Sequence, residues 1–427
     1  MFRVLIINEV SPSIKNRTSI IWEKVMPILS KKHEIKIFWL SCDYSSREKE
    51  SESWYELLHI SDFKNAREVI QKTNPSVIYL MPGISIVDYS FLITARLLNI
   101  ATFGWVDGAP VFSHNTSRKK VFLELARQFF ERKQIKSGNN KFRGLNYIKK
   151  NLFFIRSARA MEKNYDYIIS ELLEQFNSML FFKRESGKKI HARYNTDLLL
   201  VENEPTIEYE SNLGLLKSNM KLVGDPTYDF AFQESRNKII SYPKNKLQVL
   251  FITVNFTSGQ GESDWTPTKQ KKMISELVQE YEKLKDEIDL KIKIHPISEN
   301  YSSYKKILEY YKSDIQIYQT EDIYELIKNV DVILTTSSST AGLISIIMQK
   351  PIVVWNYFHV KEDIFIKNEL VIHCENASEI KECLINGIKF SQENRVKINQ
   401  FIEKYCGDGN ASEKIANEVE RLLLEHN

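Results

Sequence analysis

The chain has 427 residues, of which 43% are hydrophobic and 11% aromatic, and its formal net charge is +4. This composition is typical of a soluble globular protein and excludes an intrinsically disordered or collagen-like chain. The length predicts two or three domains, each large enough to bury a core. Only 14 residues are glycine, and neither G-x-x-x-x-G-K-[ST] nor G-x-G-x-x-G occurs. A P-loop NTPase and a standard dinucleotide-binding domain therefore lose their main sequence signals.

The cysteines and the first residues indicate the compartment. The four cysteines form no C-x-x-C pair, so we expect neither a zinc knuckle nor a disulfide framework. Residues 1–7 enter an apolar run without a cleavage site, which favours a buried first strand over a signal peptide. No apolar run reaches the roughly 18 residues of a membrane span. We therefore expect a cytoplasmic protein.

Short β-branched runs alternate with amphipathic stretches in the first half of the chain, a pattern that predicts βαβ units and a parallel sheet. In chain order, the expected elements are strand Val4–Asn8, helix Ser19–Leu29, strand Ile35–Leu40, helix Asn65–Lys72, strand Ser76–Leu80, helix Ser90–Leu98 and strands Thr102–Trp105, Tyr167–Ser170, Asp197–Val201 and Lys221–Val223.

The pattern restarts near Lys246 and predicts a second α/β array. Because a polar junction at 237–245 separates the arrays, we expect two Rossmann-like α/β domains that face one another across a cleft. Ligands of open α/β sheets bind outside the carboxyl ends of the strands. The expected elements are strand Leu247–Thr253, helix Lys269–Leu284, strand Leu290–Ile294, helix Tyr304–Tyr311, strand Ile315–Tyr318, helix Ile323–Lys328, strand Val332–Thr335, helix Ala341–Met348, strand Pro351–Val354 and a final helix Ala411–Leu424.

One candidate loop follows the strand Leu290–Ile294, where Pro296 stops the strand and leaves His295 at its carboxyl end. A histidine there can donate a hydrogen bond to a phosphate, and Lys293 adds positive charge if it faces the same way. A lone histidine at a strand end is more often a satisfied structural residue, so neighbouring loops must decide between the two interpretations.

A second candidate loop is the run of six hydroxyl residues Thr335–Thr340, between a strand and a helix that contains Gly342. A helix N-terminus presents unpaired N–H groups and the positive end of its dipole. The hydroxyls of Ser337, Ser338, Ser339 and Thr340 add donors, so the turn suits a phosphate. An ordinary N-cap needs only one hydroxyl, which makes phosphate binding the better interpretation.

Two further loops follow strands. Asp107 comes after the strand Thr102–Trp105, where a carboxylate can serve as a general base, although Asp107-Gly108 is equally a common turn. Residues 255–262 follow the first strand of the second array and contain Ser258, Gly259 and Gly261. The two glycines allow a ligand to approach the backbone closely, so this segment is a candidate cleft loop.

These motifs together resemble the GT-B superfamily, in particular the branch of bacterial capsule and surface-polysaccharide glycosyltransferases related to sialyltransferases, CDP-glycerol glycerophosphotransferases and UDP-N-acetylglucosamine 2-epimerases. The similar segments occur in the family's order and span most of the chain. They are Val223–Asp229, Lys293–Pro296, Glu321–Ile327, Asp331–Gly342 and Gly407–Ala416.

The resemblance implies a role for each motif. Asp107-Gly108, His295-Pro296 and Ser338-Ser339-Thr340 look like the three motifs of bacterial sialyltransferases. It makes Asp107 the base that deprotonates an acceptor hydroxyl. The resemblance makes His295 the residue that binds the donor phosphate and stabilises the leaving nucleotide. It also implies that Ser338, Ser339 and Thr340 bind the same phosphate. No D-x-D triplet occurs, which fits a mechanism without a metal.

Two departures from the family pattern bear on the substrate. Ile344 stands where related sequences often place a glutamate that binds the donor ribose. The groups that a 2-epimerase needs for elimination, including a glutamate near Val106, are not found. An epimerase therefore ranks below a transferase, and a catalytically degenerate GT-B domain that acts as a membrane-associated assembly partner is a further alternative.

Residues 116–156 form a basic segment with twelve basic and two acidic side chains, a net charge of +10. The rest of the chain has 47 basic and 53 acidic residues, so its net charge is −6. A basic amphipathic helical pair is typical of membrane-surface binding, and an ordinary helical hairpin with a solvated basic face explains it equally well. The candidate membrane-surface residues are Lys119, Lys120, Arg127, Arg132 and Lys133.

The combined prediction is an inverting, metal-independent GT-B glycosyltransferase. It moves a sugar from a nucleotide donor to a surface-polysaccharide or lipid-linked acceptor, without a cofactor and without nucleic acid, in the cytoplasm or on the inner face of the membrane. The predicted domains are 1–240 for the acceptor, with a basic helical insertion at 113–160, then 241–406 for the nucleotide sugar, and a closing helix at 407–427.

Overall fold

The structure is a computed structural model of the chain. It describes residues 1–9, 11–12, 17–44, 53–81, 85–106, 132–134, 140–181, 194–236, 245–255, 263–296, 299–361 and 363–426, and it leaves the side chains of 132–134, 140–143 and 177–181 undescribed. The described chain forms two compact units. Unit 1 holds the described residues up to Thr227 together with those from Asn410 onward, and unit 2 holds residues 228–409.

Unit 1 contains a parallel sheet of seven strands in the order β3-β2-β1-β4-β5-β8-β9. In chain order the strands read 3-2-1-4-5-6-7, so the direction of winding reverses between β1 and β4, as in a Rossmann sheet. The strands are β1 (Phe2–Asn8), β2 (Ile35–Ser41), β3 (Tyr55–His59), β4 (Val77–Tyr79), β5 (Ala101–Val106), β8 (Leu198–Val201) and β9 (Met220–Leu222).

Unit 2 contains a parallel sheet of six strands in the order β12-β11-β10-β13-β14-β15. The chain order is again 3-2-1-4-5-6, with the reversal between β10 and β13. The strands are β10 (Leu247–Ile252), β11 (Ile288–Lys293), β12 (Gln316–Tyr318), β13 (Val332–Thr335), β14 (Ile352–Trp355) and β15 (Ile372–Cys374).

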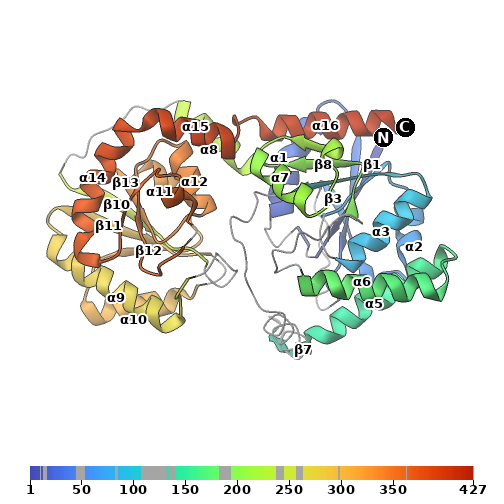
Figure 1. The fold of residues 1–427 in the computed structure, drawn as a ribbon, viewed down its shortest axis with the longest axis horizontal. Coiled ribbons are helices and arrows are strands. Elements are labelled where there is room, and N and C mark those ends of the chain that lie inside the picture. The colour runs from blue at the N-terminus through green and yellow to red at the C-terminus, as the bar shows by residue number, and fades with distance from the viewer. Residues whose placement is uncertain are drawn as a thin grey trace. The chain divides into compact units, whose positions relative to one another are not determined.

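Helices cover the faces of both sheets (Figure 1). Those of unit 1 are α1 (Arg17–Ser30), α2 (Ala66–Thr73), α3 (Ile86–Leu97), α5 (Arg143–Ala160), α6 (Tyr165–Phe181), α7 (Glu204–Asn212) and α16 (Ala411–Glu425). Helix α8 (Pro226–Arg236) begins in unit 1 and continues into unit 2. Those of unit 2 are α9 (Pro267–Leu284), α10 (Tyr301–Tyr311), α11 (Ile323–Lys328), α12 (Thr340–Ile347), α13 (Ile364–Lys367), α14 (Ile380–Glu393) and α15 (Arg395–Tyr405).

Side-chain caps fix where several of these helices begin. Asn65 accepts a hydrogen bond from the Glu68 N–H at the start of α2, and Thr266 accepts one from the Lys269 N–H at the start of α9. Each cap satisfies an N–H group that has no partner inside the helix. Pro267 follows directly at the first position of α9, where its missing N–H costs nothing.

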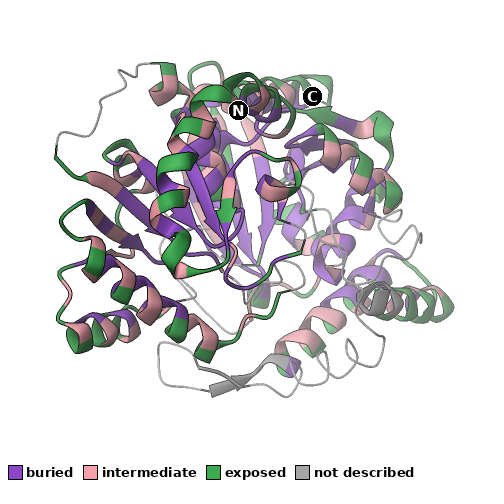
Figure 2. Cartoon of the chain, turned by 60° about the vertical axis from the view of Figure 1, so that its left-hand side comes forward, coloured by how far each residue is buried: buried purple, intermediate pink, exposed green. Residues whose placement is uncertain are grey.

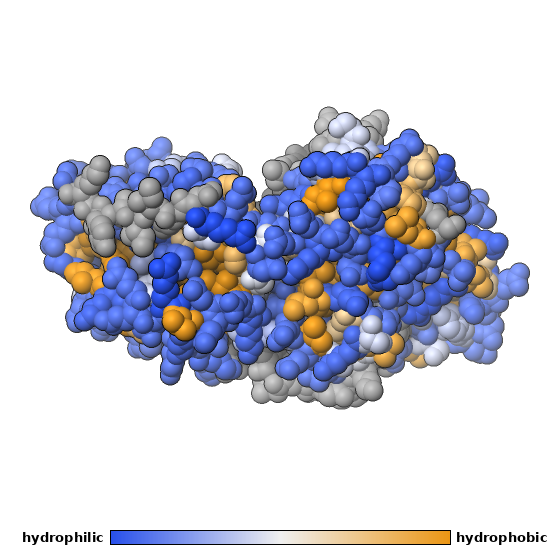
Figure 3. Space-filling view, turned by 90° about the horizontal axis from the view of Figure 1, so that it is seen from above, coloured by the Kyte–Doolittle hydropathy of each residue, from blue (hydrophilic) through white to orange (hydrophobic). Residues whose placement is uncertain are grey.

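The central strands are buried on both faces, as Figure 2 shows for the purple ribbons of the sheets. In unit 1, one face of the sheet packs under α1 and α16, where Trp22, Val419 and Leu423 join the core. Burial on both faces explains why the strands read as continuous apolar runs without alternation. On the surface that Figure 3 shows, hydrophobic side chains form scattered groups among hydrophilic ones.

Two segments differ from the sequence-based expectation. The predicted strand Tyr167–Ser170 is wrong, because these residues lie in helix α6. Asn164 accepts a hydrogen bond of 2.9 Å from the Tyr167 N–H, and Ile168 and Leu172 face the core at helical spacing. The predicted helical insertion at 113–160 also contains an antiparallel pair of strands, β6 (Arg132–Gln134) and β7 (Asn140–Phe142), before α5 begins.

No helix among the described residues is both long enough and apolar enough to cross a lipid bilayer.

Candidate functional site

Three loops of unit 2 meet at the carboxyl edge of its sheet. Ile252 of β10 pairs with Lys293 of β11 on one side and with Thr335 of β13 on the other. The loops that follow these strands therefore start side by side, and those after β11 and β13 are about 10 Å apart, two strand spacings. The reversal of strand order lies here, which is where open α/β sheets bind their ligands.

His295 follows β11 and is held in this edge by its backbone. Its N–H donates to Thr253 Oγ1 at 3.0 Å and to Glu299 Oε2 at 2.6 Å. Thr253 follows β10, so the neighbouring strand and Glu299 together fix the His295 backbone. The imidazole is half-buried and belongs to a loop whose position is determined by several hydrogen bonds.

The Glu299 carboxylate is the centre of that support. Each of its oxygens accepts from two donors, Oε2 from the His295 N–H and the Thr253 hydroxyl, and Oε1 from the Tyr304 hydroxyl at 2.6 Å and the Gln270 amide. Trp265 Nε1 donates to Gln270 Oε1 at 2.9 Å and so orients the amide. Burial and the Glu299 charge raise the pKa of Tyr304, so its phenol stays a donor.

Sequence analysis did not identify Glu299, Gln270, Thr253 or Tyr304. The only sequence signal for Glu299 was its place four residues after a histidine at a strand end, where its carboxylate can accept from the histidine N–H. Gln270 comes from helix α9, and only the folded chain brings it to the carboxylate.

Burial shifts the pKa values of two basic side chains at this edge. It lowers the pKa of His295 below its ordinary value, an effect that the nearby Lys293 charge reinforces and Glu299 opposes. At neutral pH the imidazole is therefore mainly uncharged, with one nitrogen able to donate a hydrogen bond. Lys293 is 7% exposed, burial lowers its pKa, and its ammonium donates to the carbonyl of Gln319, which follows β12.

The hydroxyl run after β13 divides into structural and unassigned members. Ser339 caps α12 by accepting from the Gly342 N–H at 3.1 Å, Thr335 donates to the Ser337 carbonyl at 3.0 Å, and Ser337 donates to Asp363 at 2.8 Å. The hydroxyls of Ser338 and Thr340 have no hydrogen bond to the part of the chain that the structure describes. Both lie at the start of α12.

Thr336 adds an unusual polar atom to this loop. Thr336 is 1% exposed, and its hydroxyl has no hydrogen-bond partner among the described residues. A buried hydroxyl without a partner costs free energy, so the loop retains an unmet capacity for hydrogen bonding.

Asp363 joins the loop after β13 to the loop after β14 and was not identified from the sequence. It is 2% exposed. Oδ2 accepts from the Ser337 hydroxyl and the Ser338 N–H, and Oδ1 accepts from the N–H groups of Phe365 and Ile366 at 2.9 and 3.0 Å. One carboxylate thus caps α13 and fixes the backbone of the hydroxyl loop, and it uses two donors that a phosphate could otherwise take.

Gly342 and Ile344 both face the interior. A Cβ added at Gly342 would lie 2.7 Å from Cε2 of Phe365, so close packing of this ring accounts for the glycine. Ile344 is 4% exposed and belongs to the apolar core of unit 2. The position at which the family pattern places a ribose-binding glutamate is therefore a core position in this structure.

Several predicted site residues lie outside the described residues. They are Asp107, the cleft-loop residues Ser258, Gly259 and Gly261, and the basic residues Lys119, Lys120 and Arg127. Arg132 and Lys133 have a described backbone in β6, but nothing is described of their side chains.

The carboxyl edge of the sheet in unit 1 carries acidic groups that sequence analysis missed. Lys150 of α5 contacts Glu9 after β1 at 2.5 Å. Near this pair, Asp88 in the first turn of α3 is desolvated, which raises its pKa to about 7, although the hydrogen bond with Ser85 opposes the shift.

A second acidic pair lies after β8 and β9. Glu202 and Asp225 are 3% and 0% exposed, and Arg17 contacts both, at 3.6 Å for Glu202. The Arg17 guanidinium also lies 5.3 Å from the ring centroid of Trp105. Since the Glu202 N–H donates to the Val106 carbonyl at 3.3 Å, this pair adjoins the strand end that precedes Asp107.

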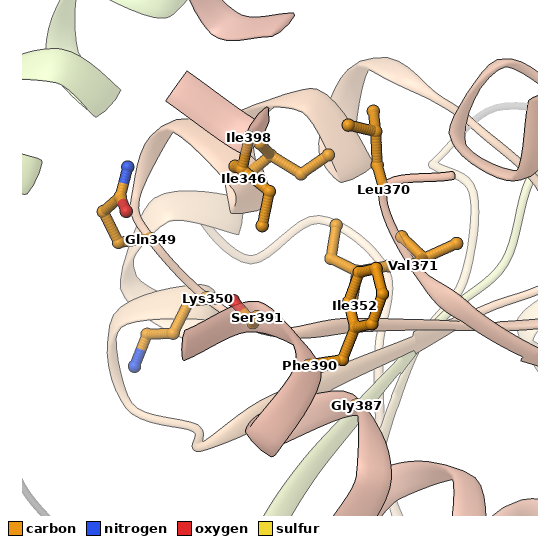
Figure 4. Close-up of a pocket in the computed structure, with 10 residues that line it drawn as sticks. All are labelled: Ile346, Gln349, Lys350, Ile352, Leu370, Val371, Gly387, Phe390, Ser391 and Ile398. Carbon is orange, nitrogen blue, oxygen red and sulfur yellow. The ribbon is translucent and has the colours of Figure 1, made fainter. Parts of the chain in front are cut away.

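One further pocket in unit 2 does not suit catalysis. It lies at the opposite, amino end of β14 and β15, and apolar side chains such as Ile346, Ile352 and Ile398 line most of it (Figure 4). Its charged group, the Lys350 ammonium, donates to the carbonyls of Lys328 and Val330 and so caps the end of α11.

The fold is similar to several solved structures. A variant of the wall teichoic acid polymerase TagF aligns with a TM-score of 0.56 at 12% identity, covering 99% of this chain and 89% of that chain. S. aureus MnaA, solved with UDP, aligns with a TM-score of 0.51 at 12% identity, covering 99% and 97%. The UDP-GlcNAc 2-epimerase of Methanocaldococcus jannaschii aligns with a TM-score of 0.51 at 14% identity, covering 98% and 100%.

No protein family model matches the chain, and no curated protein matches its sequence. The identities to the solved structures are low, so these similarities establish the fold alone. That fold is GT-B, with two Rossmann-like α/β domains, and the predicted fold class is confirmed.

Proposed function

We propose that this protein is an inverting glycosyltransferase that moves a sugar from a nucleotide donor to a hydroxyl of a surface-polysaccharide or lipid-linked acceptor. The observation that carries the proposal is the carboxyl edge of the unit 2 sheet. There His295, held by Glu299, lies two strands from the hydroxyl-rich start of α12.

The donor phosphates are assigned to the loop after β13. Ser338 and Thr340 supply hydroxyl donors, and the first turn of α12 supplies N–H groups at the positive end of the helix dipole. The unpartnered Thr336 hydroxyl supports the same assignment. The fold neighbour MnaA, which was solved with UDP, supports a nucleotide donor. The fold neighbour TagF, a wall teichoic acid polymerase, supports a surface-polymer acceptor.

In the proposed reaction, Asp107 takes the proton of the acceptor hydroxyl, and the oxygen attacks the anomeric carbon. The bond from that carbon to the donor phosphate oxygen breaks, and the nucleotide leaves with both bonding electrons. A direct displacement of this kind inverts the anomeric centre. A His295 imidazole with a lowered pKa donates a hydrogen bond to the departing phosphate without needing to be charged.

Binding of nucleotides tests the donor site. We expect UDP, CDP, CMP or GDP, or one of their sugars, to raise the melting temperature, because a ligand of the native state stabilises it. His295→Ala should weaken the same ligand by about tenfold or more, the value of one hydrogen bond to a charged group. His373→Ala, at an exposed position on β15, is the matched control. The donor site is excluded if no nucleotide binds, or if both variants bind equally well.

Product analysis separates the transferase from its two rivals. A transferase releases nucleotide from the matching sugar only in the presence of an acceptor, whereas a 2-epimerase converts the donor alone. The core position of Ile344 and the occupation of two loop donors by Asp363 favour a degenerate domain as the second candidate. That candidate predicts that no nucleotide sugar is turned over with any acceptor.

A further inference from the structure

Helices α5 and α6 together expose more large apolar side chains than any other described pair of neighbouring elements. Among the described residues, 18 large hydrophobic side chains are exposed, and seven of them lie within this one helical pair. The two helices are joined by the turn at 161–164, contact one another, and lie next to each other in Figure 1. The seven are Leu145, Ile148, Leu152, Tyr165, Ile169, Leu173 and Phe176.

The spacing shows that these side chains form stripes. In α5, positions 145, 148, 152, 156 and 159 share one helical face, opposite the face where Phe153, Phe154 and Ala158 enter the core. In α6, positions 165, 169, 173 and 176 recur at the same spacing, while Ile168 packs into the core. Each helix therefore has one apolar stripe directed at the core and a second one in solvent.

The charges around the stripes have one sign on α5. This helix contains no aspartate or glutamate. Its exposed face continues from Leu152 into Arg156 and Arg159, both exposed. The β6–β7 pair ends directly before α5 and contributes Arg132, Lys133 and Lys141 in sequence. On α6, Glu171 and Glu174 lie on the helical flank away from the apolar stripe, and the exposed Asp166 lies in the first turn beside Tyr165.

We propose that the exposed faces of α5 and α6 dock this protein onto an anionic lipid surface. Apolar side chains enter the boundary between headgroups and acyl chains, and the basic residues contact the lipid phosphates. A second copy of the chain fits less well, because a symmetric contact would place two segments of net charge +10 against each other. The inference does not depend on the proposed transferase activity.

Flotation of the full-length protein with vesicles tests the proposal. We expect binding to phosphatidylcholine vesicles that contain about one-third phosphatidylglycerol, and little binding to phosphatidylcholine alone. Replacing Ile148, Leu152, Ile169 and Leu173 by serine together should lower the vesicle partition coefficient by about tenfold or more, since binding scales with buried apolar area. Ile385→Ser combined with Val396→Ser, two exposed positions of unit 2, is the matched control and should bind like the wild type.

Two results would overturn the proposal in that assay. One is the absence of binding to anionic vesicles. The other is equal binding of the four-serine protein and the wild type, with full release at high salt, which would assign attraction to the basic residues alone. Hydrogen exchange of α2 and α3, which contact α5, verifies that the four-serine protein is folded.

A fluorescent probe identifies the occupant directly. Leu173→Cys in a Cys383→Ser background provides one accessible thiol, because Cys42, Cys374 and Cys406 are buried. An environment-sensitive fluorophore at this position should report water in the free protein and an apolar medium with anionic vesicles. An apolar signal without vesicles at every protein concentration would assign the stripe to a contact with another segment of the same chain. An apolar signal that grows with protein concentration would assign it to a second copy. Either result contradicts lipid docking.

Discussion

The six strands of the unit 2 sheet follow the same order as the first six strands of the unit 1 sheet, yet the carboxyl edges of the two sheets carry different groups. In unit 1 the edge buries carboxylates, Glu202 and Asp225 against Arg17, with Asp88 near the Glu9–Lys150 pair. In unit 2 the edge presents an imidazole, serine and threonine hydroxyls and a helix start, and its carboxylates Glu299 and Asp363 are saturated with donors.

This difference shows that a shared strand order does not determine the chemistry of the residues that follow the strands. The strand order determines where a ligand can bind, and the residues after each strand determine its chemistry. Burial raises the pKa of Asp88 at the edge of unit 1. The edge of unit 2 instead places an imidazole and hydroxyl groups beside a helix start. The following substitutions test this contrast, from the largest expected effect to the smallest.

Arg17→Gln should break the unit 1 edge most severely. It leaves Glu202 and Asp225, both almost fully buried, without their shared cation, so we expect the free energy of unfolding to fall by about 3 kcal/mol. Urea denaturation measures the loss, and hydrogen exchange assigns it to unit 1. Lys32→Gln, which removes a surface pair with Glu420 at 2.7 Å, is the control. Equal effects of the two changes would show that the buried pair needs no cation.

Glu299→Gln should damage the unit 2 edge instead. Each oxygen of Glu299 accepts from two donors, so an amide nitrogen in place of either one leaves two donors unmet. We expect a loss of about 2 kcal/mol, with faster hydrogen exchange at the amides of Ile294 and His295. Glu309→Gln, at an exposed pair with Lys305, should change neither quantity. Unchanged exchange around His295 would contradict the supporting role of Glu299.

Asp88→Asn tests the unit 1 edge through the pH dependence of the free energy of unfolding. The folded pKa of Asp88 is about 7, above its unfolded value, so the native state binds more protons between about pH 4 and 7. The wild-type free energy of unfolding therefore falls as pH rises through this window and levels off above it. The D88N protein lacks this fall and should be more stable at pH 8 by about 1–2 kcal/mol, a discounted figure because Asp88 is only partly buried. Urea denaturation at pH 5 and pH 8 measures the difference, and equal values at both would refute it.

Lys150→Gln should have the smallest effect. Lys150 lowers the pKa of Asp88 and pairs with the half-exposed Glu9. Its loss should cost about 0.5 kcal/mol at pH 8 and extend the fall of stability to higher pH. The same denaturation series measures both, with Lys36→Gln, which breaks an exposed pair with Glu56, as the control. A stability curve with the wild-type pH dependence would show that Lys150 does not influence Asp88.

The sequence predicted most strands of the two parallel sheets. Strand β13 and helix α11 occur at the predicted bounds, and both arrays of alternating elements are present. The short edge strand β3 was not predicted, since Tyr55–His59 carries no clear alternation. The strand predicted at Tyr167–Ser170 followed local β-propensity, and the cap at Asn164 and the apolar spacing of α6 override it.

The candidate site was predictable only in its local part. His295 and the hydroxyl run follow strands, a relation that is visible in the sequence. Glu299, Gln270 and Asp363 act through contacts between separate segments, such as Asp363 with Ser337, 26 positions away. This tertiary contact gives Ser337 a structural role, and no property of the run itself indicates that role.

Helix α16 has a consequence for synthesis of the chain. It supplies Ile415, Val419 and Leu423 to the core of unit 1, although the whole of residues 228–409 is translated between the two parts of that unit. At about 5–20 residues per second, these 182 positions delay the helix by roughly 10–40 s on the ribosome. During that interval, nascent unit 1 has an uncovered apolar groove beside α1, which a chaperone could bind, while unit 2 emerges as a contiguous stretch able to fold first.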